Sequence, residues 1–222
     1  MGAPTAAIVD YRLGNLFSIQ QACAHAGLQA AVTSSAEEIR AADAVILPGV
    51  GAFGDAMETL RGLGSVEVLR EIARGGKPLM GICLGMQLLM SESAEFGRHE
   101  GLGIIPGDVV RLAPGLPELK VPHVGWNRII RAGSEVWDGT LLEETPDGTA
   151  MYFVHSYYVR PVDPGIVLSR TRYGQLEFCS SLRRERVFAC QFHPERSGPD
   201  GLRVYQAFAR QIAQPAAEAA HG

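Results

Sequence analysis

Two short segments of the sequence contain residues that could do covalent chemistry. The first is Gly81-Ile82-Cys83-Leu84-Gly85, in which a cysteine lies between two glycines at the end of an apolar run. This pattern is typical of a nucleophile elbow, a sharp strand-to-helix turn that exposes the nucleophile and needs small residues two positions away. The following helix would favour a thiolate at Cys83 through its dipole, and the Leu84 N–H would face a developing oxyanion.

The second segment is Gln191-Phe192-His193-Pro194-Glu195. A thiol nucleophile needs a base, and the base needs an acceptor that orients it. In an extended chain residues i and i+2 point the same way, so Glu195 can lie beside His193. Taken alone, a cysteine between glycines can be a buried structural residue, and a His-x-Glu sequence can be a surface imidazole. Together, the two segments favour a triad of Cys83, His193 and Glu195.

Three further segments could bind a ligand or a partner. Pro48-Gly49-Val50-Gly51 follows an apolar strand and can be a plain turn, or a loop that lets a ligand approach the backbone closely. Two segments rich in polar aromatic residues, Pro122–Asn127 and Tyr152–Tyr158, fit either strand packing or a contact surface. His123 and His155 lack the spacing to a second ligand that zinc sites show, so we expect no metal.

Composition excludes several classes of protein. The 222 residues are 46% hydrophobic and 20% charged, which suits a folded core rather than disorder. The net charge of −4 argues against a nucleic-acid binder, and no apolar run is long enough to cross a membrane. The four cysteines form no Cys-x-x-Cys pair, and the N-terminus lacks the basic region of a signal peptide. We therefore expect a cytoplasmic protein.

The hydrophobic pattern predicts an α/β fold with a mostly parallel open sheet flanked by helices. Strands alternate with helices in the N-terminal half, and antiparallel strands follow in the C-terminal half. We expect one domain over residues 1–222, with a core at about 6–213 and a frayed tail at 214–222. The predicted strands are Ala6–Asp10, Leu28–Thr33, Ala44–Leu47, Pro78–Cys83, Val109–Leu112, Asn127–Arg131, Ala150–Arg160, Ile166–Thr171, Leu176–Leu182 and Val187–Phe192. The predicted helices follow Asn15 and Ser35 and cover Ser65–Ala73, Leu84–Met90 and Gly201–Ala213.

These segments resemble the class I, or triad, glutamine amidotransferases. The sequences GICLGMQLL and QFHPE carry this resemblance. The sequences DYRLGN, LPGVGAFGDAM, PHVGWN and YFVHSYY resemble, more narrowly, the glutaminase subunits of imidazole glycerol phosphate synthase. The resemblance spans about Ala6 to Ile212 and departs from the family at Arg196, where a lysine is usual.

The resemblance implies a mechanism without a cofactor. Cys83 would attack the side-chain amide of L-glutamine and form a γ-glutamyl thioester, His193 would transfer protons, and Glu195 would orient His193. The oxyanion would be held by the Leu84 N–H and by a backbone N–H of the segment Gly49, Val50 and Gly51. The expected substrate contacts are Gln87, His155, Ser156 and Tyr157.

The resemblance also implies a partner. Ammonia would pass to a TIM-barrel cyclase subunit in a heterodimer, which makes imidazole glycerol phosphate and AICAR in histidine biosynthesis. The family positions at or near this interface are Asn15, Trp126, Tyr152 and Arg196. We expect a gate in the segment Pro48-Gly49-Val50-Gly51, because glycines let a peptide plane turn over at low steric cost, and the sequence leaves the resting orientation of the Gly49–Val50 peptide open.

Three other interpretations fit parts of the sequence. One is a glutaminase that serves another synthase, as in pyridoxal phosphate or purine synthesis, but PGVGAF and PHVGWN argue against it. Another is an inactive chain that binds and regulates a partner, which the complete set of triad residues disfavours. The last is a cysteine peptidase on a related α/β fold, which would not need a His-Pro-Glu sequence so late in the chain.

Overall fold

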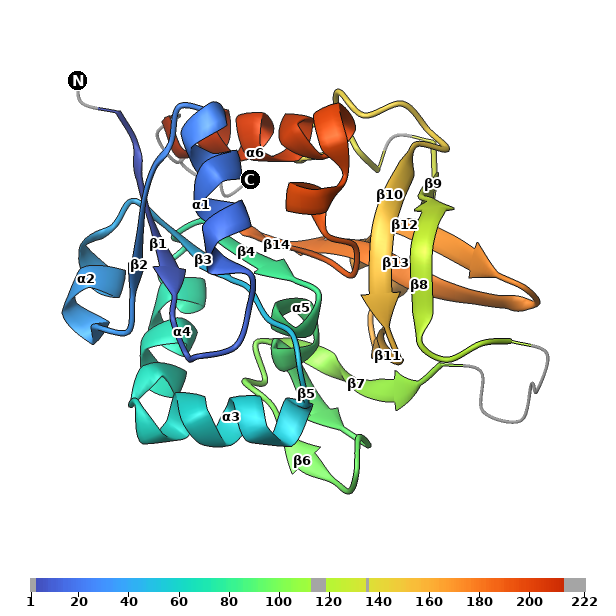
Figure 1. Cartoon of the computed structure of the whole chain (residues 1–222), viewed down its shortest axis with the longest axis horizontal. Coiled ribbons are helices and arrows are strands. Elements are labelled where there is room, and N and C mark those ends of the chain that lie inside the picture. The colour runs from blue at the N-terminus through green and yellow to red at the C-terminus, as the bar shows by residue number, and fades with distance from the viewer. Residues whose placement is uncertain (1–2, 113–118, 135, 214–222) are drawn as a thin grey trace, which may run out of the picture.

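The computed structural model of the chain describes residues 3–112, 119–134 and 136–213 (Figure 1). The tail predicted at 214–222 lies outside the described residues. Within the described ranges, no helix has both the length and the apolarity that crossing a membrane requires.

The N-terminal part alternates strands and helices, as the sequence predicts. Its strands are β1 (Thr5–Val9), β2 (Gln29–Thr33), β3 (Ala44–Leu47) and β4 (Leu79–Ile82). Its helices are α1 (Leu16–His25), α2 (Ala36–Ala41), α3 (Phe53–Gly62), α4 (Ser65–Arg74) and α5 (Leu84–Leu88). Helix α3 is not among the predicted elements, because the glycine-rich segment before it masks the spacing of its buried residues, which are Phe53, Ala56, Met57 and Leu60.

The C-terminal part is rich in strands and closes with a helix. Its strands are β5 (Met90–Ser93), β6 (His99–Glu100), β7 (Ile105–Arg111), β8 (His123–Arg128), β9 (Ile130–Arg131), β10 (Ala150–His155), β11 (Tyr157–Pro161), β12 (Val167–Tyr173), β13 (Leu176–Arg184) and β14 (Val187–Cys190). Two 3-10 turns, η1 (Pro164–Ile166) and η2 (Pro194–Arg196), and helix α6 (Gly198–Ala213) complete the described elements.

An eight-stranded sheet in the described residues has the order β2-β1-β3-β4-β14-β13-β12-β9. The first five strands of this order are parallel neighbours, and β13, β12 and β9 continue it in antiparallel fashion. The predicted α/β class with added antiparallel strands is therefore confirmed. Strand β14 differs from the expectation, since it pairs in parallel with β4 and so belongs to the parallel core.

Helices cover both faces of this sheet, which explains why its central strands are apolar on both sides. Figure 1 shows α1 and α6 on one side, and α3 and α4 on the other. Successive strand residues divide between two cores, because side chains alternate across a sheet. Ile8 packs in the cluster that contains α1 and α6 residues, and Val9 packs in the cluster that contains α3 and α4 residues.

The predicted strand at 150–160 is interrupted at Ser156 and serves two small sheets. Strand β10 pairs antiparallel with β8, and β11 pairs antiparallel with β7, which lies in the sheet β11-β7-β5-β6. The chain therefore passes from one small sheet to the other between β10 and β11. Ser156 alone lies outside both ladders, and its carbonyl accepts the Leu112 N–H at 2.7 Å.

We predict that Gly85→Ala destabilises the protein. An added Cβ would lie 1.8 Å from the carbonyl oxygen of Leu47, a backbone atom that cannot rotate away. Overpacking of this kind costs about 1–3 kcal/mol or more. The matched control is Gly62→Ala at the end of α3, where nothing lies within 4 Å of the new Cβ. Thermal unfolding should show a lower Tm for the first variant only, and equal Tm values would contradict the close approach of α5 to β3.

Candidate active site

Cys83 lies at a strained turn between β4 and α5. Its φ is +54° and its ψ is −109°, a conformation that residues other than glycine rarely adopt. An added Cβ at Gly81 would lie 3.0 Å from Leu89 Cδ1 and 3.1 Å from the Met86 nitrogen, so a side chain here would require its neighbours to shift. The two glycines of the motif thus allow the sharp turn that the sequence predicts.

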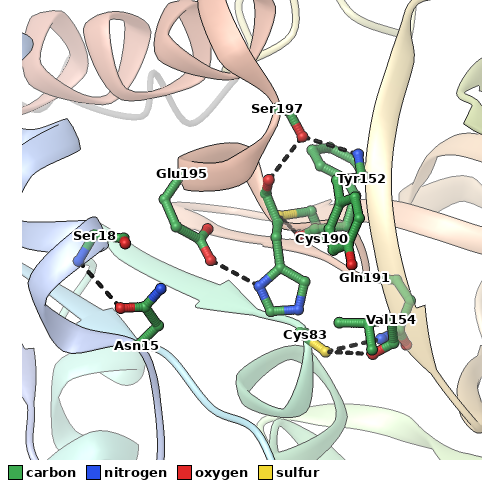
Figure 2. A network of polar contacts seen from close by, with 11 residues as sticks. Asn15, Ser18, Cys83, Tyr152, Val154, Cys190, Gln191, Glu195 and Ser197 are labelled. Carbon is green, nitrogen blue, oxygen red and sulfur yellow. Dashed lines mark hydrogen bonds and ion pairs between the residues drawn. The ribbon is translucent and has the colours of Figure 1, made fainter. Parts of the chain in front are cut away.

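The sulfur of Cys83 is almost buried, with a residue exposure of 5%, and faces polar groups of β10 and of the chain after β14. Gln191 Nε2 donates to the Cys83 sulfur at 3.5 Å, and the Val154 carbonyl oxygen lies 3.8 Å from it (Figure 2). The backbone N–H of Cys83 donates to the Cys190 carbonyl at 2.8 Å. These contacts hold the turn from both sides of the sheet edge.

His193 and Glu195 form a buried pair. His193 Nδ1 donates to Glu195 Oε1 at 2.7 Å, and the two side chains are 6% and 1% exposed (Figure 2). The segment is a 3-10 turn rather than the extended chain that we expected, and this turn still brings the two side chains together. His193 Nε2 is buried and has no hydrogen-bond partner among the described residues, so it remains available for proton transfer.

The backbone of His193 is fixed by Tyr152 and Ser197. The His193 N–H donates to the Tyr152 carbonyl at 2.9 Å, and the Ser197 hydroxyl donates to the His193 carbonyl at 2.7 Å. The Tyr152 N–H in turn donates to the Ser197 oxygen at 3.0 Å (Figure 2). Strand β10 therefore contacts both His193, through the Tyr152 carbonyl, and the Cys83 sulfur, through the Val154 carbonyl.

The charges of the site keep His193 protonated. Burial by itself lowers the pKa of an imidazole, because it disfavours the cation. The electrostatic effect of Cys83 and, after it, the contact with Glu195 act in the opposite direction, and the pKa of His193 rises to about 10. The contacts with Cys83 and Glu195 therefore favour the protonated imidazole.

In residues 49–51, which we call the oxyanion segment, the Gly49 carbonyl and not an N–H group faces the Leu84 N–H. The Leu84 N–H donates to the Gly49 carbonyl oxygen at 3.4 Å. In a trans peptide the C=O and the following N–H point in opposite directions, so the Val50 N–H points away from Leu84. The predicted pair of donors, Leu84 N–H and a backbone N–H of residues 49–51, is not assembled in this conformation.

A cavity of about 230 Å³ adjoins Cys83 and gathers most of the predicted substrate residues. Its lining includes Val50, Gly51, Leu84, Gln87, His155, Ser156 and Tyr157. Gly49 is not part of the lining and reaches the site through its contact with Leu84. A larger cavity of about 590 Å³ between α4 and residues 184–187 contains none of the predicted site residues, so its size does not mark the site.

Glu95 lines the same cavity and is absent from the predicted set. Its Oε2 accepts the Phe53 N–H at 2.7 Å. Burial raises the pKa of Glu95, and the Phe53 hydrogen bond and the charge of His99 partly offset this effect. A lone glutamate in the polar segment after β5 has no motif around it, so only the folded chain reveals its position beside Cys83.

A chain of neutral side chains supports the cavity from behind. Gln87 Nε2 donates to the Tyr157 carbonyl at 3.0 Å, and His155 Nδ1 donates to the same oxygen at 2.9 Å. His123 Nδ1 lies 3.0 Å from His155 Nε2, which therefore accepts. Burial lowers the pKa of His155 to about 3 and that of His123 to about 4. Among the residues that the structure describes, no cluster of three or more potential ligands could hold a metal ion.

Three of the four predicted interface residues lie together in a stack centred on the Tyr152 ring. The Arg196 guanidinium lies 4.3 Å from the centre of the Tyr152 ring, and Trp126 meets that ring edge to face at 6.1 Å. Trp126 is 58% exposed, so the stack reaches the surface. Asn15 is placed separately, at the start of α1, where its Oδ1 accepts the Ser18 N–H at 3.4 Å (Figure 2).

Comparison with known proteins gives the class of the fold. The family described as "Glutamine amidotransferase class-I" matches residues 7–212. A crystal structure described as a glutamine amidotransferase covers 94% of this chain and 99% of its own, with a TM-score of 0.71 and 21% identity. A structure described as PurLQS from Thermotoga maritima covers 95% of this chain and 99% of its own, with a TM-score of 0.70 and 18% identity. The solved structures show that this chain shares their fold. The family match shows that the chain belongs to the class I glutamine amidotransferases.

Two relatives of known name narrow this class. One, from Rhodopirellula baltica, is 48% identical over 203 residues, which cover 91% of this chain and 95% of the relative. The other, from Moorella thermoacetica, is 47% identical over 215 residues, which cover 97% and 98%. Both are named imidazole glycerol phosphate synthase subunit HisH. The chain belongs to this HisH family, which confirms the resemblance noted in the sequence.

We predict that Cys83→Ala lowers the pKa of His193. The thiolate is the largest of the effects that raise this pKa to about 10, and its removal leaves burial opposed by Glu195 alone. NMR titration of the His193 imidazole would measure the change. His155 is the internal control, because burial holds its pKa at about 3 and it stays neutral around pH 7 in both proteins. A His193 pKa that remained near 10 would mean that Glu195 alone retains the proton.

Proposed function

We propose that this enzyme hydrolyses L-glutamine to L-glutamate and ammonia as the glutaminase subunit of imidazole glycerol phosphate synthase. The observation that carries the proposal is the strained Cys83 beside a cavity, together with the buried pair of His193 and Glu195. The ammonia passes to a TIM-barrel cyclase subunit in a cytoplasmic heterodimer. The cyclase uses it to make imidazole glycerol phosphate and AICAR in histidine biosynthesis.

The first half-reaction releases ammonia. The Cys83 thiolate attacks the side-chain amide carbon of glutamine, and the amide oxygen takes up the negative charge. The C–N bond then breaks as His193 Nε2 gives its proton to the departing nitrogen, and a γ-glutamyl thioester remains on Cys83. The raised pKa of His193 supports this step, because the proton is in place before the bond breaks.

The second half-reaction regenerates the enzyme. Neutral His193 takes a proton from water as the water oxygen attacks the thioester carbon. Glutamate leaves when the C–S bond breaks, and the thiolate and the imidazolium are restored. Glu195 keeps the ring in one orientation and stabilises its charge in both half-reactions.

The cavity residues supply one charged contact and several polar contacts to glutamine. The carboxylate of Glu95 is the partner for the α-ammonium group, because it lines the cavity and carries the opposite charge. Gln87 is held by its bond to the Tyr157 carbonyl, which supports a fixed position at the cavity wall. His155, Ser156 and Tyr157 supply further contacts, since all three line the cavity.

The exposed stack of Trp126, Tyr152 and Arg196 is the surface that binds the cyclase. Aromatic residues and arginine are favoured in the centres of interfaces. Strand β10 carries Tyr152 in this stack and Val154 against the Cys83 sulfur. A partner that contacts Tyr152 therefore touches β10 two residues before Val154, whose carbonyl meets the Cys83 sulfur.

We also infer that the Gly49–Val50 peptide gates the reaction. Its carbonyl lies against the Leu84 N–H, where a developing oxyanion would be repelled. A turn of this peptide plane would bring the Val50 N–H to the same place. Losing one such donor costs about 2.7–4 kcal/mol, or about 10²–10³ in rate. The partner needs only to shift the population toward the second orientation.

We predict that Cys83→Ala lowers glutamine-dependent turnover of the complex by more than about 10³-fold, because no acyl-enzyme can form. The same complex should still make imidazole glycerol phosphate from added ammonium, which shows that the fold and the interface survive. The matched control is Cys23→Ala, which removes a buried thiol from α1 and should retain glutamine turnover. Glutamine-dependent turnover by Cys83→Ala would refute the proposed function.

We predict that the isolated chain hydrolyses glutamine slowly and that the partner accelerates it by about 10²–10³-fold, the value of one oxyanion donor. Glutamate release should be measured for the chain alone, for the complex, and for the complex with its ribonucleotide ligand. Equal turnover in all three would reject the gate while leaving the roles of Cys83 and His193 intact.

A further inference from the structure

Tyr11 is a buried tyrosine that the mechanism above does not use. It follows β1, is only 1% exposed, and packs among apolar residues of β3, α3 and α5. Its hydroxyl donates to the carbonyl of Pro48 at 2.5 Å. Pro48 immediately precedes the Gly49–Val50 peptide, so this bond joins the end of β1 to the base of the oxyanion segment.

The tyrosine hydroxyl also occupies the space beside Gly49. A Cβ added at Gly49 would lie 2.0 Å from the Tyr11 oxygen, and 3.0 Å from Leu84 Cβ. The residues after Tyr11 continue along the same segment, because a Cβ at Gly14 would lie 3.8 Å from the Pro48 ring and one at Gly51 would lie 3.7 Å from Leu13. The oxyanion segment therefore rests on the loop that follows β1, with the hydroxyl at its centre.

The hydroxyl remains a hydrogen-bond donor to Pro48. Burial, with a contribution from the charge of Cys83, raises the pKa of Tyr11 far above its usual value. The phenol consequently keeps its proton at any pH at which the enzyme is assayed. Within the described ranges, the Pro48 carbonyl has no N–H donor among the backbone bonds outside regular elements, and a buried carbonyl that loses its partner is destabilising.

We propose that Tyr11 is a positioning residue of the oxyanion segment, which holds the Pro48 carbonyl still so that only the next peptide plane turns. This inference rests on the proposed function and on its gate. With Pro48 fixed, rotation of the Gly49–Val50 peptide replaces the Gly49 carbonyl with the Val50 N–H at the same place beside Leu84. Without the hydroxyl, the whole segment can shift, and the Val50 N–H no longer meets the oxyanion at the right distance.

The test is Tyr11→Phe in the complex with the cyclase, which removes the hydroxyl and keeps the ring. We expect kcat for glutamine to fall about tenfold, the usual effect of one lost buried hydrogen bond, and KM to change less than about twofold. Alkylation of Cys83 by iodoacetamide should keep its rate, because that displacement builds no oxyanion. The other thiols do not compete, since burial raises the pKa of Cys23 and Cys179 to about 12 and that of Cys190 well above its usual value.

The matched control is Tyr173→Phe. The Tyr173 hydroxyl also donates to a main-chain carbonyl, that of Lys120 at 2.9 Å, but it lies outside the oxyanion segment. Its kcat should equal that of the wild type. An unchanged kcat in Tyr11→Phe would overturn the proposal. So would a parallel loss of kcat and of alkylation rate, because Tyr11 would then act through the nucleophile.

Gly49→Ala provides a second, independent test that does not depend on the stability of one variant. The new Cβ collides with the Tyr11 oxygen, so Gly49→Ala should lose more activity in the wild-type background than in the Tyr11→Phe background. Strictly additive losses would overturn the proposed contact. A wild-type complex that fails to hydrolyse glutamine would instead reject the proposed function itself.

Discussion

The positive φ of Cys83 is the constraint on which the rest of the site depends. A residue with a side chain pays about 1–3 kcal/mol for such a conformation, and it persists only when the surroundings determine it fully. Here those surroundings are the parallel strands on either side of β4. The Cys190 carbonyl of β14 accepts the Cys83 N–H, and the Leu47 carbonyl of β3 lies against Gly85. The sheet therefore has to place β14 next to β4 in parallel, and the same strand then leads directly to His193.

Burial and charge oppose each other at the pair of His193 and Glu195, and charge prevails. A buried imidazole without partners loses its proton readily, as the low pKa values of His123 and His155 illustrate a short distance away. His193 is buried to a similar degree but faces Glu195 and Cys83, so its pKa moves in the opposite direction. Histidines of similar burial thus differ in pKa because of the groups placed opposite them, and this difference separates the proposed proton carrier, His193, from His123 and His155.

The sequence allowed the fold class and the elbow to be predicted because both depend on local patterns. Apolar runs bounded by glycine predict the strands of the parallel core, and a cysteine between glycines can be recognised without long-range information. Glu95, the parallel pairing of β14 and the interruption at Ser156 depend on contacts between distant segments, which no local pattern encodes. The orientation of the Gly49–Val50 peptide is equally beyond the sequence, because two glycines permit both orientations at similar steric cost.

The contact between the Gly49 carbonyl and the Leu84 N–H gives the site two possible uses for one donor. The bond is long, at 3.4 Å, and a bond of that length is weak, so breaking it costs little. In the proposed mechanism, a substrate oxyanion offers the Leu84 N–H a charged acceptor, and charge-assisted bonds are roughly twice as strong as neutral ones. The oxyanion is a stronger acceptor for the Leu84 N–H than the Gly49 carbonyl is. The turned peptide is therefore favoured only when negative charge develops on the substrate or when a partner holds the segment. A weak internal bond at the oxyanion position is therefore compatible with low activity at rest and with a small energetic demand on the partner.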